Sequence, residues 1–466
     1  MQPFLAAVLR LLVGLLQVWL NRAWLKLRPP AANTCTTVTI GPGKVRGLRR
    51  VTDDGTHYHL FKGIPYAVPP VGDLRFQAPV PLESFQKPVL ECFVEGSKCL
   101  QYDQILNVLV GSEDGLFLNV YTPQLPDGNA SGLPVMVYLH GGGFLSGSGD
   151  SFLYDPIYFM EQRVVIVTFN YRLGPLGFLS FPEAGIEGNA GLKDQLLVLQ
   201  WIQQNIAPFG GDPNNVTLFG ESAGAKAAYL HYLSPVSSGE GMVALVKAQK
   251  HLHSYNTHPE RLLPPVLHLP PGVNVKELAQ KVKRFYFQTR PISDATLPEM
   301  MDLLSDNEYI TATVTAAELM AKYQPKVKHY CYYFTHDGRL GNIKRLLNMA
   351  HLPGVCHGDD VFYMFHSALN AALRDDAAET IVRKAFVRMW SNFAYEGDPT
   401  PNGGDRSKGL TQWDPVESCV GKDYFKLRCL QIDASLKMVS NPFLKRTKFW
   451  RDLFRTYGYS SRTLPE

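Results

Sequence analysis

Residues 216–233 read VTLFGESAGAKAAYLHYL, in which a short apolar run is followed by a serine between two glycines and then by a helix-forming run. A strand, a tight turn and a helix are therefore expected in succession. The glycines permit the strained turn that lifts the Ser222 hydroxyl above the edge of a sheet. The following helix directs free N–H groups toward developing negative charge, and the N–H of Ala223 is the first such donor. The pattern predicts a nucleophilic serine.

Buried strands and helices alternate before this stretch. Leu116–Tyr121, Val135–His140 and Val164–Phe169 are short runs, of which the last two are almost continuously apolar, and Gly191–Ile206 has apolar residues at helical spacing. Strands that are apolar on both sides and separated by crossovers imply a sheet covered on both faces. The predicted fold class is therefore α/β, with a mostly parallel central sheet and helices on both faces.

A second glycine-rich element, His140-Gly141-Gly142-Gly143-Phe144, follows the strand predicted to end at Leu139. Consecutive glycines let bare N–H groups approach a carbonyl oxygen, so Gly142 and Gly143 are candidate oxyanion donors. Removing one such donor typically costs ~3 kcal/mol, or ~100-fold in rate. A glycine run alone is equally compatible with a plain loop, but its position ahead of Ser222 favours the oxyanion role.

A serine hydroxyl is a poor nucleophile without a base, and in this arrangement the histidine follows the serine in the chain. His357 is the favoured base, because Gly354–Asp360 is a short glycine-flanked loop that leads into an apolar run over Val361–Leu369, predicted to be helical. The alternative is a solvated loop histidine.

The composition excludes several classes of protein. The chain has 466 residues, of which 45% are apolar and 19% charged, so it can bury a large core and is not a disordered protein. Its net charge of +4 and short basic runs give no basis for nucleic-acid binding.

Seven cysteines are too few for a disulfide scaffold, and their spacing predicts no zinc site. They are expected to be buried thiols, with one disulfide between Cys92 and Cys99 as the alternative. Two glycosylation sequons begin at Asn129 and Asn215. They are compatible with a secreted glycoprotein but also arise by chance.

The N-terminal segment 1–33 is distinct from the rest of the chain. Phe4–Leu20 is strongly apolar but interrupted, which makes it a poor spanning helix. On a helix, one stripe gathers polar or small residues: Arg10, Gly14, Gln17 and Asn21. This pattern predicts a helix lying on a membrane surface through residues 4–28. A signal peptide or signal anchor and a core-packed helix are the alternatives.

Taken together, these motifs resemble the type B carboxylesterases, the family that includes the cholinesterases, and most closely the insect α-esterases. The resemblance covers roughly residues 36–454 and is carried by seven segments: FKGIPYA (61–67), GSEDGLFLNVY (111–121), HGGGF (140–144), NYRLG (170–174), GNAGL (188–192), GESAG (220–224) and HGDD (357–360). It implies an α/β-hydrolase fold in one domain over residues 34–466. It also implies an acyl-enzyme on Ser222, the base His357, an oxyanion hole from Gly142, Gly143 and Ala223, and no metal or cofactor.

The catalytic acid departs from the family pattern. Relatives carry a glutamate in an Asn-x-x-Glu-Gly turn, whereas this chain has Pro259 at that place in Tyr255–Glu260. Glu260, one position later, is the candidate acid. The chain is also shortened around residues 234–260, where relatives have a strand beside the nucleophile and helices that line the acyl pocket.

Two functional hypotheses therefore stay open. One is a carboxylic ester hydrolase acting on small-molecule esters. The other is a catalytically impaired pseudoenzyme or binding module that lacks the triad acid. We expect a membrane-associated or cytoplasmic protein inside the cell, with secretion as the alternative.

Overall fold

The computed structural model describes residues 2–28, 30–103, 108–126, 131–231, 252–264, 267, 269–370, 373–374, 376–404, 409–420 and 425–457. The sequon at Asn129 and most of the shortened stretch 234–260 lie outside these ranges. Asn215 lies inside them, in a strand.

The central sheet has eight strands. They are β1 (Cys35–Ile40), β2 (Gly43–Val51), β3 (His57–Pro65), β4 (Val89–Glu91), β7 (Phe117–Thr122), β8 (Leu133–Leu139), β9 (Val165–Phe169) and β10 (Gly211–Gly220). Their order is β1-β2-β3-β7-β9-β8-β10, with β4 paired to β2.

This sheet is mixed, so the α/β class is confirmed but the expectation of a mostly parallel sheet is wrong. The pairs β9–β8 and β8–β10 are parallel, whereas β1–β2, β2–β3, β3–β7 and β7–β9 are antiparallel. Short turns join β1 to β2 and β2 to β3, which favours antiparallel neighbours, while the parallel strands are joined by longer crossovers. The parallel part carries the HGGGF loop after β8 and the GESAG turn after β10, whereas FKGIPYA and GSEDGLFLNVY lie on or beside the antiparallel strands β3 and β7.

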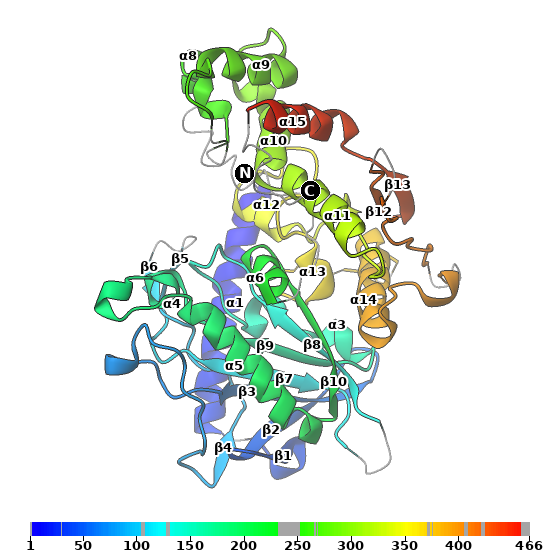
Figure 1. Cartoon of the computed structure of the whole chain (residues 1–466). Coiled ribbons are helices and arrows are strands. Elements are labelled where there is room, and N and C mark those ends of the chain that lie inside the picture. The colour runs from blue at the N-terminus through cyan, green and yellow to red at the C-terminus, as the bar shows by residue number, and fades with distance from the viewer. Residues whose placement is uncertain are drawn as a thin grey trace.

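Helices cover both faces of the sheet (Figure 1). The described helices are α1 (Gln2–Leu27), α2 (Ser151–Tyr154), α3 (Ile157–Met160), α4 (Gly174–Phe178), α5 (Ala190–Asn205), α6 (Ala223–His231), α8 (Ser254–Thr257), α9 (Val275–Phe287), α10 (Leu297–Ser305), α11 (Thr311–Tyr323), α12 (Asn342–Leu346), α13 (Val361–Met364), α14 (Ala378–Glu396) and α15 (Leu444–Tyr457). A π-helical turn, Asp306–Ile310, joins α10 to α11.

The alternation of side chains along β8 shows how the two faces are filled. Val135, Val137 and Leu139 belong to a core shared with α5 and α6, whereas Met136 and Tyr138 belong to a core shared with α3, α13 and α14. Successive side chains of a strand point to opposite faces, so an apolar strand must be covered twice. The run VMVYL thus explains why helices lie on both sides.

The C-terminal half adds a smaller sheet and a helical layer. The strands β11 (Tyr332–Phe334), β12 (Arg428–Ile432) and β13 (Lys437–Ser440) form a separate sheet, and β5 (Gln101–Asp103) pairs with β6 (Val108–Val110). The helices α9, α10 and α15 pack around a third core at the top of Figure 1. In the described part of the chain, β10 is the end strand of the central sheet.

Most of the expected elements form close to their predicted bounds. The helix after Ser222 begins at Ala223, two residues earlier than expected. The helix predicted over 361–369 is wrong in length, because Phe365 is already extended and His366 pairs with Asp155. Backbone pairing therefore ends that helix at Met364.

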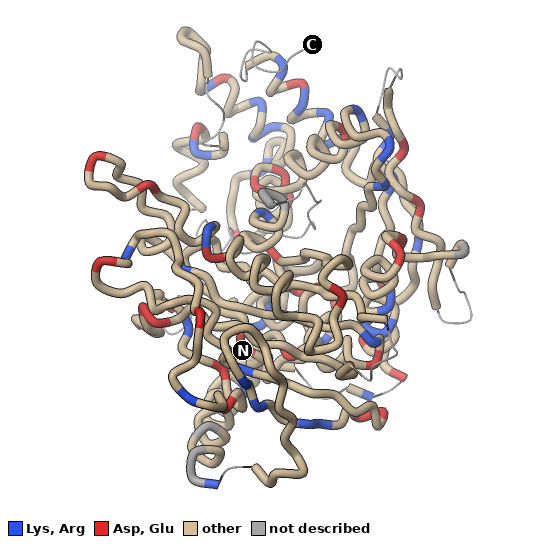
Figure 2. Tube along the Cα trace, turned by 60° about the horizontal axis from the view of Figure 1, so that its bottom comes forward, with Lys and Arg blue, Asp and Glu red and all other residues tan. Residues whose placement is uncertain are grey.

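The cysteines are thiols, and the charged residues are mixed in sign. All seven cysteines are free, so the alternative of a Cys92–Cys99 disulfide is wrong, and burial raises the pKa of both thiols. Basic and acidic residues are interspersed along the chain in Figure 2, in keeping with the small net charge.

Candidate active site

Ser222 lies at the junction of β10 and α6. Its φ of 55° is left-handed, a conformation that a serine adopts only where the surroundings enforce it. The flanking glycines explain how. A Cβ on Gly220 would lie 2.6 Å from the Leu139 carbonyl oxygen, and one on Gly224 would overlap that same oxygen. α6 therefore approaches the end of β8 so closely that both positions must be glycine. The sequence analysis expected these glycines to permit a strained turn.

The loop after β8 lies against this turn. A Cβ on Gly141 would be 3.1 Å from the Cβ of Ser222, so the two segments are in direct contact. Gly142 and Gly143 have φ values of 105° and 64°, which are accessible to glycine at little cost. Gly141 thus brings the loop into contact with the turn at Ser222, and Gly142 and Gly143 follow it directly in the chain. Their role as oxyanion donors stays a prediction.

His140 packs against this loop and contacts its backbone, a role that the sequence analysis did not assign. Its ring stacks on Tyr171 at a centroid distance of 4.3 Å, and its Nδ1 lies 2.8 Å from the carbonyl oxygen of Gly141. Burial lowers the pKa of His140 to about 4, so the ring is neutral at neutral pH. With Nδ1 assigned the proton, Nδ1–H donates to Gly141, and the Tyr171 hydroxyl donates to the His140 carbonyl oxygen at 2.7 Å.

A buried ion pair fixes the segment on the other side of the loop. Arg172 and Asp194 are fully buried and joined twice, with Nη2–Oδ1 at 2.6 Å and Nε–Oδ2 at 2.9 Å. The Arg172 backbone N–H also donates to Asp194. Two residues further on, Gly174 N–H donates to the Phe144 carbonyl oxygen at 2.7 Å. The ion pair therefore supports the end of the HGGGF loop.

His357 contacts a carboxylate, but from a residue that the sequence analysis did not single out. Its Nε2 lies 2.8 Å from Oε1 of Glu221, and each side chain is 13% exposed. The ring of Tyr309 stacks on the imidazole at 5.4 Å. Gly358, whose φ is 79°, passes so close that a Cβ there would be 3.4 Å from Glu221 Oε1. Glu221, which belongs to the turn at Ser222, therefore connects that turn to the histidine loop.

Glu260, the expected acid, has a different partner. Its Oε1 lies 3.2 Å from Nδ1 of His258, and both side chains are well exposed. Backbone hydrogen bonding, with a smaller contribution from His258, lowers the pKa of Glu260. The contact that the structure gives to Glu260 is thus with His258, and the carboxylate that meets His357 is Glu221. The signal for Glu221 was its place beside Ser222 in the GESAG turn.

Two buried aspartates hold the histidine loop. Burial raises the pKa of Asp359 to about 7, and its Oδ2 accepts the Cys356 N–H at 2.8 Å. Asp360 accepts the Tyr332 hydroxyl at 2.8 Å, and burial, with a smaller contribution from the charge of Glu221, raises its pKa. Asp359 thus holds the loop to itself, and Asp360 joins the loop to β11 of the smaller sheet.

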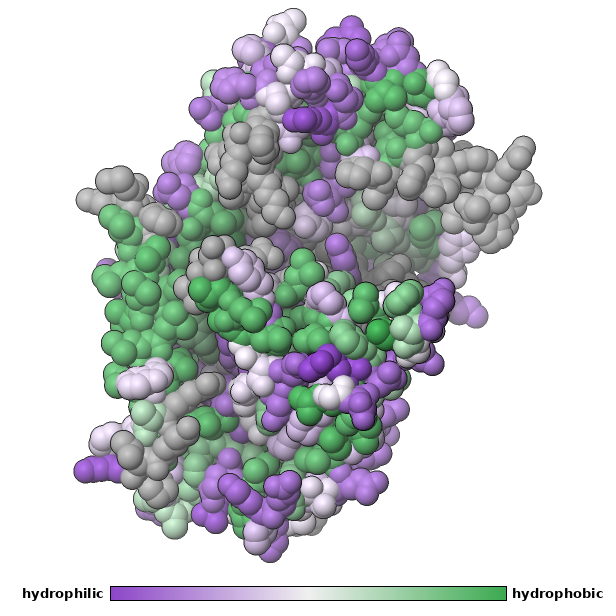
Figure 3. All heavy atoms as spheres, turned by 90° about the vertical axis from the view of Figure 1, so that its left-hand side faces the viewer, coloured by the Kyte–Doolittle hydropathy of each residue, from purple (hydrophilic) through white to green (hydrophobic). Residues whose placement is uncertain are grey.

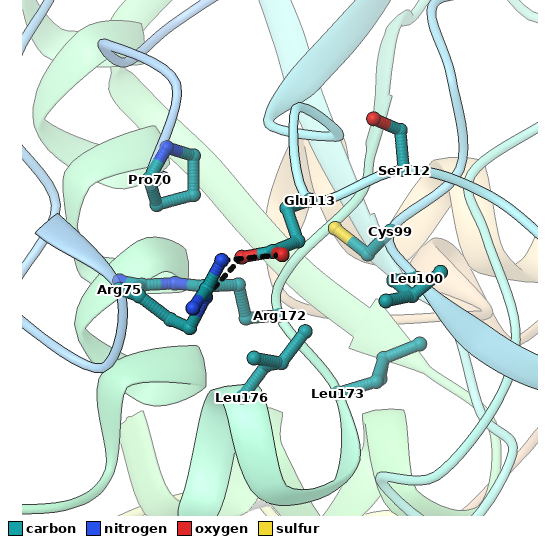
Figure 4. A pocket seen from close by; sticks show the side chains of 9 residues that line it. All are labelled: Pro70, Arg75, Cys99, Leu100, Ser112, Glu113, Arg172, Leu173 and Leu176. Carbon is teal, nitrogen blue, oxygen red and sulfur yellow. Dashed lines mark hydrogen bonds and ion pairs between the residues drawn. The ribbon is translucent and has the colours of Figure 1, made fainter. Parts of the chain in front are cut away.

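A small pocket behind the NYRLG segment is separate from this arrangement (Figure 4). Its volume of about 10 Å³ suits a single water, and a bidentate pair between Arg75 and Glu113 lies across it. Neither Ser222 nor His357 lines it. A larger pocket of about 260 Å³ lies at the opposite ends of β8 and β10, beside Leu133 and Gly211.

Comparison with known proteins shows the family to which this chain belongs. The model of the carboxylesterase family matches residues 34–260 and 244–450. The chain belongs to the carboxylesterase family. The two matches meet in the stretch where the sequence analysis found the chain to be shortened.

Three curated relatives of this carboxylesterase-family chain each match less than half of it. Esterase B1 of Culex pipiens is 45% identical over 203 residues, which are 43% of this chain and 37% of that protein. Juvenile hormone esterase of Tribolium castaneum is 45% identical over 203 residues, 42% of this chain and 33% of that protein. Para-nitrobenzyl esterase of Bacillus subtilis (strain 168) is 44% identical over 220 residues, 45% of this chain and 43% of that protein. The chain thus spans about two-fifths of the length of the curated relatives it matches.

A solved structure confirms the fold. The crystal structure of juvenile hormone esterase from Manduca sexta, with OTFP covalently attached, matches with a TM-score of 0.75. It covers 90% of this chain and 99% of that chain at 23% identity. At this identity the likeness shows the α/β-hydrolase fold alone.

Proposed function

We propose that this chain hydrolyses small-molecule carboxylic esters through an acyl-enzyme on Ser222, with His357 as the general base. The observation that carries the proposal is the strained turn at Ser222, which lies against the glycine loop. A serine held at φ 55° between two required glycines has a conformational cost that a purely structural turn would avoid. The family supports the same reaction class.

The reaction runs in two steps. Ser222 Oγ attacks the carbonyl carbon as His357 takes its proton, and the resulting oxyanion is held by N–H groups of Gly142, Gly143 and Ala223. The C–O bond to the alcohol breaks as His357 returns the proton to the leaving oxygen. Water then attacks the acyl carbon, with its proton passing to His357 and then to Ser222, which releases the acid.

We further propose that Glu221 serves as the carboxylate of the triad. An imidazole that donates Nε2–H to a carboxylate has its lone pair on Nδ1, so the serine proton is transferred to Nδ1. The carboxylate also stabilises the imidazolium that forms. Support comes from the 2.8 Å contact between two side chains that are both largely shielded from water.

One observation favours the alternative, a catalytically impaired protein. The contact of Glu260 is with His258 on an exposed turn, so the residue nearest to the family's acid in sequence does not support His357. If Glu221 cannot replace that acid, only the residual rate of ~10³-fold over water from a positioned serine and an oxyanion hole is expected.

The experiment is turnover of an aryl butyrate by the purified chain, by Ser222→Ala and by His357→Gln. The proposal predicts measurable turnover by the natural chain and loss of it in both variants, each of which should retain its circular-dichroism spectrum. Turnover that survives in folded Ser222→Ala would contradict the proposal, and a folded natural chain without turnover would favour the impaired alternative. Glycosylation at Asn129 and at Asn215 stays a prediction.

A further inference from the structure

The N-terminal helix α1 presents a continuous apolar surface to the outside. Eight of its described residues are large, apolar and 45–65% exposed: Leu5, Leu9, Leu12, Val13, Leu16, Trp19, Leu20 and Trp24. Figure 3 shows a broad hydrophobic area along the left-hand side of the molecule in this view. We call these eight residues the outer face of α1. Scattered exposed leucines are normal in soluble proteins, but a continuous face of this kind marks a binding surface.

The opposite face of the helix is fastened to the body of the protein. Ala7, Leu11 and Gly14 are buried, and a Cβ on Gly14 would lie 2.9 Å from the ring of Phe152 and 3.1 Å from Ala368. The helix packs against α2 and α12 through this side. Gly14, the small residue of the polar stripe, thus faces the protein, whereas Gln17 and Asn21 of that stripe are exposed.

The outer face has the geometry of a helix that lies in a plane. At 100° per residue its eight members fall within an arc of roughly 140°, and the buried residues fall in the opposite part of the circle. An arc of this width suits insertion into one side of a bilayer. A helix that crosses the bilayer would instead need apolar residues all round, and its inner side is already occupied by the protein.

The charge of this region indicates the kind of surface that it meets. No acidic residue precedes Asp53, while Arg10, Arg22, Lys26 and Arg28 lie on or just after the helix. The guanidinium of Arg28 lies 4.8 Å from the ring centre of Trp24, at the end of the outer face. Tryptophan beside arginine is typical of the level of lipid headgroups, where the ring is half-buried and the cation meets phosphate.

We propose that α1 binds the surface of an anionic lipid bilayer, with its outer face inserted among the acyl chains and its axis parallel to the membrane. Charge complementarity favours anionic lipid as the occupant, because the helix and the residue just after it carry four basic side chains and no acidic one. The proposal does not depend on the hydrolytic reaction. It would hold the protein where esters that partition into membranes are concentrated.

The test is sedimentation of the full chain with vesicles of phosphatidylcholine alone and of phosphatidylcholine with one quarter phosphatidylserine. The natural chain should bind the anionic vesicles at least tenfold more tightly than the neutral ones. The double variant Leu9→Glu/Leu16→Glu should lose at least tenfold in that binding. Leu109→Glu, a change at an equally exposed leucine on β6, should bind within twofold of the natural chain.

The proposal would be overturned by equal binding of the double variant, by absence of binding by the folded natural chain, by a dimer in light scattering that dissociates in the double variant, or by a mature N-terminus beyond α1 in mass spectrometry. Residues Leu5–Leu25 are also long and apolar enough to cross a membrane by length and composition. Protein that carbonate at high pH fails to release from the vesicles would therefore show a spanning helix and contradict the surface orientation.

Discussion

Glu221 and His357 are joined through Oε1 and Nε2 at 2.8 Å, although 136 residues separate them in the chain. Glu221 is fixed by the strained turn, and His357 by a loop whose buried aspartates anchor it. The contact therefore links two independently positioned segments. It gives His357 the carboxylate partner that the proposed mechanism uses as the acid of the triad.

Replacing Glu221 by glutamine tests this contact. The amide keeps the shape of the side chain but removes the charge that stabilises an imidazolium, so kcat should fall by about 10²–10⁴-fold with KM little changed. The measurement is steady-state hydrolysis of an aryl butyrate. Glu260→Gln is the matched control and should retain activity within about twofold; the reverse pattern would assign the acid to Glu260.

Gly224→Ala should disrupt the turn itself. The new Cβ would overlap the Leu139 carbonyl oxygen, which belongs to a central strand and cannot move away. We expect a loss of about 3 kcal/mol or more in the free energy of unfolding, measured by urea denaturation. Gly397→Ala is the control, since a Cβ there meets open space, so that the only cost is its left-handed φ of 65°, a strain that Gly224 does not have. That control should lose only about 1 kcal/mol, and equal losses would contradict the explanation by overlap.

The Arg172–Asp194 pair should matter for stability more than any surface pair. Asp194→Ala leaves a buried guanidinium without its partner, so the free energy of unfolding should fall by about 3–5 kcal/mol. The neighbouring residue offers a control, because Lys193 pairs with Glu187 at the exposed surface. Lys193→Ala should change stability little. Similar urea midpoints for the two variants would show that the buried pair does not support the fold.

Asp359 should make stability depend on pH. Burial raises its pKa to about 7 in the folded protein, against about 3.9 in an unfolded chain. The folded state thus binds the proton more tightly, so its contribution to stability is present below pH 4 and is lost as the pH rises through 7. The slope approaches about −1.4 kcal/mol per pH unit in that window. Asp359→Asn should remove this component in urea unfolding between pH 5 and 8; an unchanged slope would refute the assignment.

The local features of this protein could be predicted from its sequence, because residues close in the chain determine them. The turn at Ser222 follows from glycines that admit its backbone, and the filling of both faces of β8 follows from its apolar run. The mixed sheet was missed because antiparallel pairing of β3 with β7 and of β7 with β9 joins strands that are distant in sequence. Pairing at such distances leaves no periodic signal.

The partner of His357 could not be predicted for a related reason. A family pattern pointed to the stretch around Glu260, whereas the contact arises where the loop after Gly354 folds back onto the turn at Ser222. Only the folded chain brings Glu221 and His357 together. The polar stripe of α1 was visible in the sequence, but not that Gly14 alone of its members would be buried against Phe152 while Gln17 and Asn21 stay exposed.

The central claim, a working nucleophile at Ser222, is tested most directly by covalent labelling. The purified chain would be treated with a fluorophosphonate and the modified peptide identified by mass spectrometry, with Ser222→Ala as the control. The account predicts one adduct, on Ser222, that is absent from the control. A folded chain that takes up no label, or a label that persists in Ser222→Ala, would contradict it.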